Sequence, residues 1–284
     1  MAVRPRTLSA AVAPVVVGTA LAGSESTFRP LAFVAALVGS VFIQIGTNLS
    51  NDYSDARRGA DTEDRLGPVR VTAGGLMPPR RVLVGTYVAF AVALAAGLYL
   101  TVIAGPELLV VGLVSILAGV LYTGGPRPYG YEGLGEVFVF LFFGVVAVAG
   151  SYFVQTERIS ADALVLAVPI GLLAAAILVV NNIRDIDTDR RAGKRTLAVK
   201  LGRARARLVY AAMIGLPFLI APLPLALSGL AGAWLVIFAA PGAVSLARVV
   251  LTKSDGPALN SALAGTGALL AGYSVLLAAG LLVS

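Results

Sequence analysis

Long apolar stretches recur along the whole chain and constrain its fold more than any other feature. Most are roughly 16 to 24 residues long, the length that a helix needs to cross about 30 Å of hydrocarbon. Nine are expected as membrane spans, at about 8–23, 31–50, 82–104, 106–121, 135–154, 161–182, 208–227, 231–251 and 258–283. Hydrophobic residues make up 58% of the 284 residues and charged residues only 13%, too few to cover a water-soluble domain. The sequence therefore predicts an all-α, polytopic membrane protein forming one domain over residues 1–284.

The distribution of positive charge predicts how the spans are oriented. All of the 22 Lys and Arg residues except Arg29 and Arg158 fall on one side of the nine expected spans. Because cytoplasmic loops are enriched in Lys and Arg, that side and the N-terminus are predicted to be inside, with the chain in the cell membrane. The net charge of +7 then reflects membrane topology, and no basic and aromatic module indicates a nucleic-acid partner. The first span is expected to be retained, not cleaved as a signal peptide, since eight further spans follow.

The residue types that the chain lacks restrict its chemistry. It contains no Cys and no His, which excludes disulfides, thiolate nucleophiles, Cys/His zinc sites and acid–base catalysis by His. Any bound metal must therefore accept oxygen ligands, and Mg²⁺ or Mn²⁺ is expected.

Acidic and amide side chains gather in a first cluster at the end of the second apolar stretch. Asn48, Asn51, Asp52 and Asp55 are spaced i, i+3, i+4 and i+7, which places all four on one face of a helix. Grouped carboxylates beside a membrane repel one another and are costly to desolvate, so they usually face a cavity, pair with cations or hold a metal. We expect this face to be a stripe of metal ligands.

A second cluster follows the sixth apolar stretch on the same predicted side. Asp185 and Asp189 are four residues apart, and Asn181 lies one turn earlier. Asp187 points away from this stripe if the helix continues. Two stripes facing one another would hold Mg²⁺ and leave positions for phosphate and water. Each stripe alone is equally typical of helix caps or surface ion pairs.

Basic residues surround both clusters and favour an anionic ligand. The candidate phosphate donors are Arg57, Arg58, Arg65, Arg70, Arg184, Arg190, Lys194 and Arg195. A third segment, residues 122–136, is rich in Gly and Pro and predicts a structured turn. Its Arg127 could reach a phosphate, and its tyrosines either face the site or belong to an interfacial aromatic belt. Carboxylates for a metal and cations for an anion together predict a diphosphate site.

These residues resemble the UbiA superfamily of intramembrane prenyltransferases over the whole chain. Asn51-Asp52-x-x-Asp55 resembles its first aspartate-rich motif and Asp185-x-x-x-Asp189 its second. The finer resemblance is to the branch that prenylates 1,4-dihydroxy-2-naphthoate in menaquinone synthesis. It rests on Gly59-x-Asp61-x-x-x-Arg65-x-Gly67-Pro68, Tyr122-Thr-Gly-Gly-Pro126 and Asn181-Asn182-x-Arg184-Asp185. Two positions depart from the superfamily pattern: Gly59 stands where a third aspartate is usual, and Arg127 where Lys is common.

The resemblance implies a UbiA-type bundle of nine helices and a set of site residues. The implied metal ligands are Asn48, Asn51, Asp52, Asp55, Asp61, Asn182, Asp185 and Asp189. The implied catalytic residues are Asp52, Asp55, Asp185, Asp189, Arg65, Tyr122, Arg127 and Lys194. The cofactor would be Mg²⁺, with Mn²⁺ as the other candidate.

The implied reaction transfers a polyprenyl group from polyprenyl diphosphate to 1,4-dihydroxy-2-naphthoate. Diphosphate and CO₂ leave, demethylmenaquinone forms, and the prenyl tail lies along apolar helix faces beside membrane lipid. Three alternatives remain: another acceptor such as 4-hydroxybenzoate, a cation or organic-ion transporter, and a phosphatidyltransferase, whose contiguous Asp-rich motif the chain lacks. The sequence specifies neither the prenyl chain length nor the oligomeric state.

Overall fold

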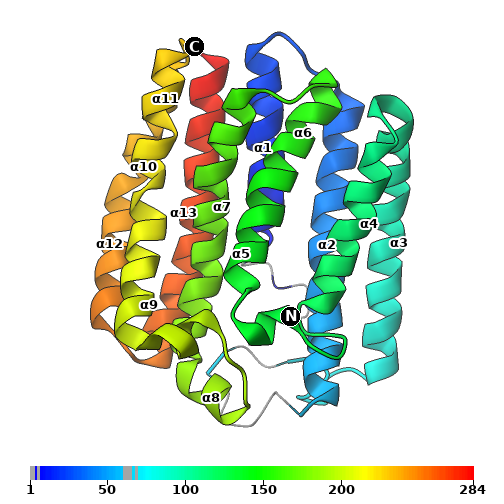
Figure 1. Cartoon of the computed structure of the whole chain (residues 1–284), viewed down its shortest axis with the longest axis vertical. Coiled ribbons are helices and arrows are strands. Elements are labelled where there is room, and N and C mark those ends of the chain that lie inside the picture. The colour runs from blue at the N-terminus through cyan, green and yellow to red at the C-terminus, as the bar shows by residue number, and fades with distance from the viewer. Residues whose placement is uncertain (1–3, 5–6, 60–65, 68–69) are drawn as a thin grey trace.

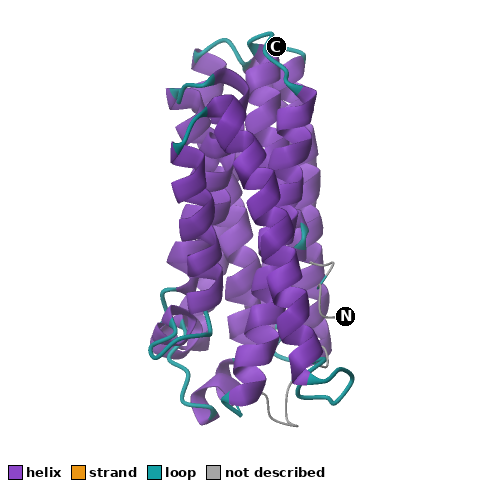
Figure 2. Ribbon diagram, turned by 90° about the vertical axis from the view of Figure 1, so that its right-hand side faces the viewer, coloured by secondary structure: helices purple, strands orange, loops and turns teal. Residues whose placement is uncertain are grey.

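The computed structural model describes residue 4 and residues 7–59, 66–67 and 70–284. All regular structure in these residues is helical, and the loops gather at the two ends of the molecule (Figure 2). The membrane helices are α1 (Ser9–Ser24), α2 (Pro30–Arg57), α3 (Pro79–Ala104), α4 (Glu107–Leu121), α5–α6 (Gly135–Thr156), α7 (Ala161–Arg184), α9–α11 (Leu197–Leu227), η4–α12 (Ala231–Thr252) and α13 (Gly256–Leu282).

Within the described residues, seven of these helices are long and apolar enough to cross a membrane, and α1 and α4 are shorter apolar helices. Together they match the nine predicted spans, and the chain is a multi-pass membrane protein. Pro30 and Pro79 begin α2 and α3, where a missing backbone N–H costs nothing because the first helical N–H groups have no partner in the helix.

One predicted boundary is wrong. The seventh helix begins at Leu197 and not near 208, because the Thr196 side chain accepts a hydrogen bond from Val199 N and caps an earlier start. Gly202, with φ 77° and ψ 160°, then interrupts the helix. The charged stretch of residues 197–207, which precedes the predicted span, therefore forms a capped helical segment that leads into it.

Helix α7 is the centre of the bundle. It packs against α9, α13 and the α5–α6 segment, while α2 packs against α3 and α4 (Figure 1). Its apolar side chains Leu166, Ile170, Leu173 and Ile183 are fully buried. A helix that is apolar on all sides is expected at such a position.

The α5–α6 helix changes its winding next to α7. Residues Phe140–Val146 form a π-helical turn between α5 (Gly135–Val139) and α6 (Ala147–Thr156). A Cβ atom at Gly144 would lie 2.8 Å from Gly171 Cα of α7, so the two backbones touch without side chains between them. This close approach sets α5 directly beside the end of α7.

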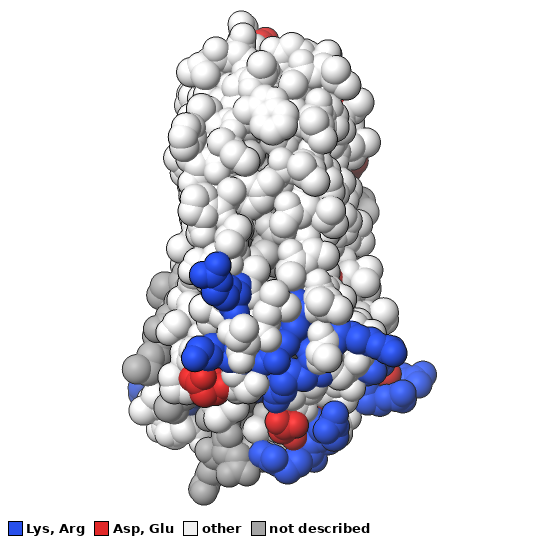
Figure 3. All heavy atoms as spheres, turned by 90° about the vertical axis from the view of Figure 1, so that its left-hand side faces the viewer, with Lys and Arg blue, Asp and Glu red and all other residues white. Residues whose placement is uncertain are grey.

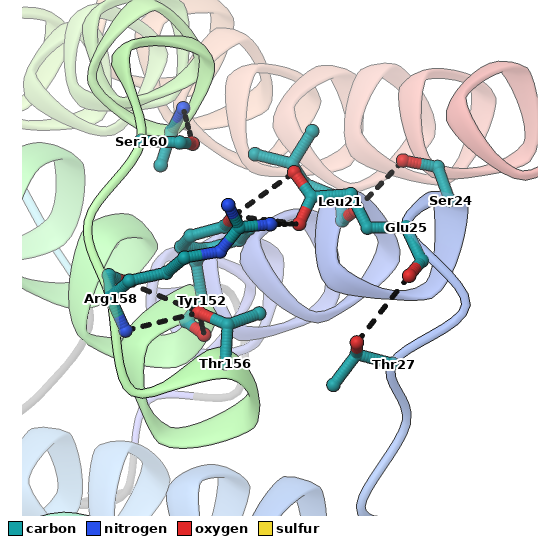
Figure 4. Close-up of polar contacts among 9 residues, drawn as sticks. Leu21, Ser24, Glu25, Thr27, Tyr152, Thr156, Arg158 and Ser160 are labelled. Atoms are coloured by element: carbon teal, nitrogen blue, oxygen red, sulfur yellow. Dashed lines mark hydrogen bonds and ion pairs between the residues drawn. The ribbon is translucent and has the colours of Figure 1, made fainter.

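Polar contacts close the end of the bundle that lies away from the acidic clusters (Figure 4). Tyr152 Oη donates to Glu25 Oε2 at 2.8 Å, and Arg158 Nη2 donates to the same oxygen at 2.5 Å. Arg29 N donates to Gln155 Oε1 at 2.6 Å. These bonds tie the α1–α2 loop to the end of α6 and to the α6–α7 loop.

Most basic side chains lie at the opposite end. On the face shown in Figure 3, Lys and Arg form a band around the lower end, where α8 (Ile186–Arg191) lies, and the rest of that face is almost free of charge. The two acidic clusters lie at this same end. We call it the acidic end, after the clusters.

Candidate active site

A cavity of about 350 Å³ opens between α1, α2, α3, α4, the α5–α6 segment and α7. Polar residues line it at the acidic end: Asn48, Asn51, Asp55, Arg70, Tyr122, Thr123, Tyr131, Asn181, Asn182, Asp185, Asp189 and Lys194. Farther along the helices its walls are mostly apolar or small, and include Ala36, Gly97, Leu100, Leu108 and Val154. The cavity is therefore amphipathic, with a polar chamber and a long apolar arm.

The first predicted stripe lies on one buried face of the last three turns of α2. All four of its members are buried, because the helix continues past the apolar span to Arg57. Asn51 Oδ1 accepts a hydrogen bond from Thr123 Oγ1 at 2.9 Å. Asn48, Asn51 and Asp55 line the cavity.

Asp52 has a different environment from the rest of its stripe. Its Oδ1 accepts from Thr72 N at 2.9 Å and its Oδ2 from Val71 N at 3.1 Å. It is not among the cavity-lining residues. In this structure Asp52 holds the α2–α3 loop against the helix, and the loop in turn places Arg70 beside Asp55.

The second predicted stripe contains a break. Helix α7 ends at Arg184, Asp185 has φ −93° and ψ 7°, and α8 follows. Asp189 N still donates to Asp185 O at 2.8 Å, so the spacing of one helical turn is kept. Arg184 donates to both carboxylate oxygens of Asp185, at 2.7 and 2.6 Å. Asp185 and Asp189 line the cavity opposite α2.

Arg184 is buried and does not serve as a free phosphate donor here. Besides Asp185, it donates to Asn181 Oδ1 at 2.8 Å and to Asn260 Oδ1 of α13 at 2.6 Å. These bidentate and shared bonds fix the geometry at the break. Arg184 therefore orients the second stripe.

The sequence did not single out Glu136 as a site residue. This α5 carboxylate is 4% exposed, and its Oε1 accepts a hydrogen bond from Asn182 Nδ2 at 2.8 Å. The signal in the sequence was a carboxylate at the start of an apolar span. Its partner could not be foreseen from the sequence because Asn182 lies 46 positions along the chain, on another helix.

Tyr122 lies between the two stripes at the end of α4. Burial raises the pKa of its phenol, and the negative charges of Glu136, Asp55 and Asp189 raise it further. The phenol therefore stays neutral and keeps its proton for hydrogen bonding. Lys194 Nζ lies 4.7 Å from the ring centroid of Tyr131, close enough for a cation–π contact.

One further predicted site residue, Arg127, lies away from the cavity. Arg127 is exposed on the 122–135 loop and does not line it. Asp61 and Arg65 lie outside the described residues. Asp187, which was expected to point away, is exposed and pairs with Arg203 at 2.9 Å. The predicted turn over residues 122–136 is confirmed up to residue 134, with one 3₁₀ turn at Tyr129–Glu132, and its last two residues begin α5.

The donor set suits a hard divalent cation. Among the described residues no three acidic side chains lie close enough to hold a metal by themselves. Mg²⁺, however, usually binds through one or two carboxylates and completes its shell with water and substrate phosphates. The amide and carboxylate oxygens of Asn51 and Asp55 on α2, and of Asn182, Asp185 and Asp189 across the cavity, fit that mode.

The fold and this cavity define a polytopic helical membrane protein with a polar chamber at one end of an apolar arm. A sequence model of the UbiA prenyltransferase family matches residues 11–270. The chain belongs to this family, as its motifs indicated.

Individual relatives and solved structures agree with this assignment. The chain is 42% identical over 266 residues to a 1,4-dihydroxy-2-naphthoate octaprenyltransferase of Mycobacterium tuberculosis, covering 93% of this chain and 89% of the relative. It is 40% identical over 277 residues to a protein of the same name from Escherichia coli, covering 94% and 90%. A UbiA homologue from Aeropyrum pernix K1 matches with a TM-score of 0.73 at 15% identity and 97% coverage of both chains. Another from Archaeoglobus fulgidus, solved with DMAPP and Mg²⁺, matches with a TM-score of 0.62 at 14% identity and the same coverage. The predicted UbiA-type bundle is therefore confirmed.

Proposed function

We propose that this protein transfers a polyprenyl group from polyprenyl diphosphate to 1,4-dihydroxy-2-naphthoate. The observation that carries the proposal is the amphipathic cavity, whose polar chamber suits a diphosphate and whose apolar arm suits a prenyl tail. The names of the bacterial relatives at 40 to 42% identity support this donor and acceptor.

The diphosphate lies in the polar chamber between the two stripes. Asn51, Asp55, Asn182, Asp185 and Asp189 would hold Mg²⁺, or Mn²⁺ in its place. When bound there, the cation would supply positive charge against the departing diphosphate. Lys194 and Arg70 face the same chamber and supply positive charge for the remaining phosphate oxygens. Arg127 has no contact with the chamber in this conformation, so the proposal gives it no direct role.

The chemistry requires no dedicated protein base. The bond between the allylic carbon and the diphosphate oxygen breaks, and its electron pair leaves with the diphosphate. The naphthoate carbon that bears the carboxylate bonds to the allylic carbon. Loss of CO₂ returns its bonding electrons to the ring, so the quinol form of demethylmenaquinone results without proton removal from that carbon. The neutral phenol of Tyr122 is placed to orient the acceptor by a hydrogen bond.

The proposed setting is the cell membrane, with the acidic end toward the cytoplasm. The concentration of Lys and Arg at that end supports this orientation. Residues 1–284 act as one domain, and membrane lipid surrounds the apolar faces of the bundle. Both proposed substrates reach the polar chamber from the cytoplasmic side of the bilayer.

A prenyl-transfer assay tests the proposal. Purified protein in detergent receives radiolabelled octaprenyl diphosphate and Mg²⁺, with 1,4-dihydroxy-2-naphthoate and 4-hydroxybenzoate offered in parallel. Product with the naphthoate alone, lost on chelation and restored by Mg²⁺, is expected. Product with only 4-hydroxybenzoate overturns the acceptor, and no product with either overturns the activity.

A further inference from the structure

Glu136 and Asn182 form a buried pair at the wall of the polar chamber. Glu136 Oε1 accepts from Asn182 Nδ2 at 2.8 Å, and among the described residues Glu136 Oε2 has no hydrogen-bond partner. A buried carboxylate with a single side-chain hydrogen bond is costly. A buried carboxylate with so few partners therefore calls for a structural or functional reason.

The carboxylate restricts its partner in a way that an amide would not. An ionised carboxylate accepts hydrogen bonds and cannot donate them, whereas an Asn side chain has a donor end and an acceptor end. In this structure Asn182 turns Nδ2 toward Glu136, and the two atoms Nδ2 and Oε1 lie 2.8 Å apart. Because the amide is planar, Oδ1 points away from Glu136, and Asn182 is one of the residues that line the cavity.

This orientation decides which kind of ligand Asn182 can serve. An NH₂ group facing the chamber would bind phosphate oxygens and repel a cation. An oxygen facing the chamber binds a cation and repels phosphate. We propose that Glu136 is a positioning residue that fixes the Asn182 amide with its oxygen toward the chamber, so that Asn182 serves the divalent cation and not the diphosphate. The proposal rests on the proposed function, and specifies one part of its metal site.

The proximity of α5 and α7 makes this arrangement possible. The π-helical turn that follows α5 contacts α7 through the backbones of Gly144 and Gly171. Gly135, next to Glu136, would place a Cβ 3.1 Å from Tyr122 and 3.0 Å from Leu178 of α7. The pair is therefore held in a tightly packed layer, and its hydrogen bond has little room to rearrange.

A charge exchange tests the proposal by direct metal binding. Mn²⁺ binding is measured by electron paramagnetic resonance on purified protein with an unreactive geranyl thiolodiphosphate. The proteins are wild type, Glu136→Gln, Asn182→Asp and the double variant Glu136→Gln/Asn182→Asp. Glu25→Gln is the matched control, because Glu25 bonds Tyr152 and Arg158 at the far end of the bundle.

The expected result is a specific loss and recovery of Mn²⁺ affinity. Glu136→Gln frees the amide to turn and weakens Mn²⁺ binding by at least about tenfold, the usual effect of removing a group that orients a metal ligand. Asn182→Asp sets two carboxylates against each other and also weakens binding. In the double variant the introduced glutamine amide donates to the introduced aspartate, a carboxylate oxygen again faces the chamber, and affinity returns to wild type or better. Glu25→Gln lowers thermal stability and leaves Mn²⁺ affinity unchanged.

Other outcomes overturn the proposal. Wild-type Mn²⁺ affinity in Glu136→Gln, or a double variant no better than the weaker single variant, shows that the amide orientation does not matter. If Glu136→Gln does not fold, the Mn²⁺ affinity of the double variant alone tests the proposal, since that variant restores a complementary pair. Failure of the proposed function is separate: wild-type protein would then bind Mn²⁺ and the analogue without forming prenylated naphthoate.

Discussion

Tyr131 Oη donates a hydrogen bond of 2.6 Å to Asp55 Oδ1, across 76 positions of sequence. The other oxygen of the same carboxylate, Oδ2, pairs with Arg70 Nη2 at 2.9 Å. Asp55 is thus the point where the α2–α3 loop and the 122–135 loop meet. The shape of the polar chamber depends on this junction, because all three residues line the cavity.

Replacing Tyr131 by Phe should lower prenyl transfer while the fold is kept. The ring stays beneath Lys194, and the hydrogen bond to Asp55 is lost. A hydrogen bond to a charged group contributes about 1.5–3 kcal/mol, which corresponds to a loss of about tenfold to a hundredfold in kcat/KM for polyprenyl diphosphate. Tyr129→Phe is the matched control, since the Tyr129 hydroxyl donates to Ala118 O and not to an acid. Equal losses in both variants would contradict a special role for the Asp55 contact.

Asp52→Asn and Asp189→Asn should both reduce activity, for different reasons. Asn at position 52 has one acceptor oxygen where Asp52 uses two to hold Val71 N and Thr72 N. We expect a loss of at least about tenfold together with faster proteolytic cleavage between residues 58 and 78. Asp189→Asn should lose activity with wild-type cleavage. Limited proteolysis in parallel with the rate assay separates the two, and unchanged cleavage of Asp52→Asn would show that Asp52 does not hold the loop.

The spans and the stripes could be predicted from sequence because both depend on local periodicity. Apolar length defines a membrane helix, and the i, i+3, i+4 and i+7 spacing of Asn48 to Asp55 places them on one helix face. Contacts between distant segments have no such signature. Neither the backbone bonds of Asp52 to residues 71 and 72 nor the Glu136–Asn182 pair follows from spacing. The position of Arg127 also depends on how its loop folds. Its charge suggested a phosphate contact, but in the structure Arg127 does not line the cavity.

The pH dependence should show no contribution from Tyr122 ionisation. Burial, with the nearby carboxylates, raises the pKa of Tyr122 above its ordinary value of 10.0. A raised pKa keeps the phenol protonated to higher pH, so activity should not fall near pH 10 through loss of its proton. Tyr122→Phe should lower the rate and leave the shape of the pH–rate profile unchanged. A basic limb near pH 10 that disappears in Tyr122→Phe would show that the phenol ionises in the working range.

The apolar arm should set the response to prenyl chain length. Gly97, Gly112 and Gly150, from α3, α4 and α6, all line the cavity, and no atom lies within 4 Å of a Cβ added to any of them. Each lies within about two turns of the end of its helix that is farther from the acidic end. The three open positions therefore face the far part of the arm, which only a long tail would occupy.

Gly112→Phe should then discriminate between donors. A Phe side chain in the arm overlaps the path of a long tail, and overpacking of about 1–3 kcal/mol corresponds to a loss of about fivefold to a hundredfold with octaprenyl diphosphate. Dimethylallyl diphosphate does not reach this depth and should react at the wild-type rate. Gly272→Phe is the matched control, because Gly272 of α13 also faces open space but does not line the cavity. Replacing Gly by Phe raises helix propensity equally in both variants. A difference in rate between them therefore reports the effect of the side chain inside the arm. If Gly112→Phe lowered the rate equally with both donors, the long tail would not pass Gly112.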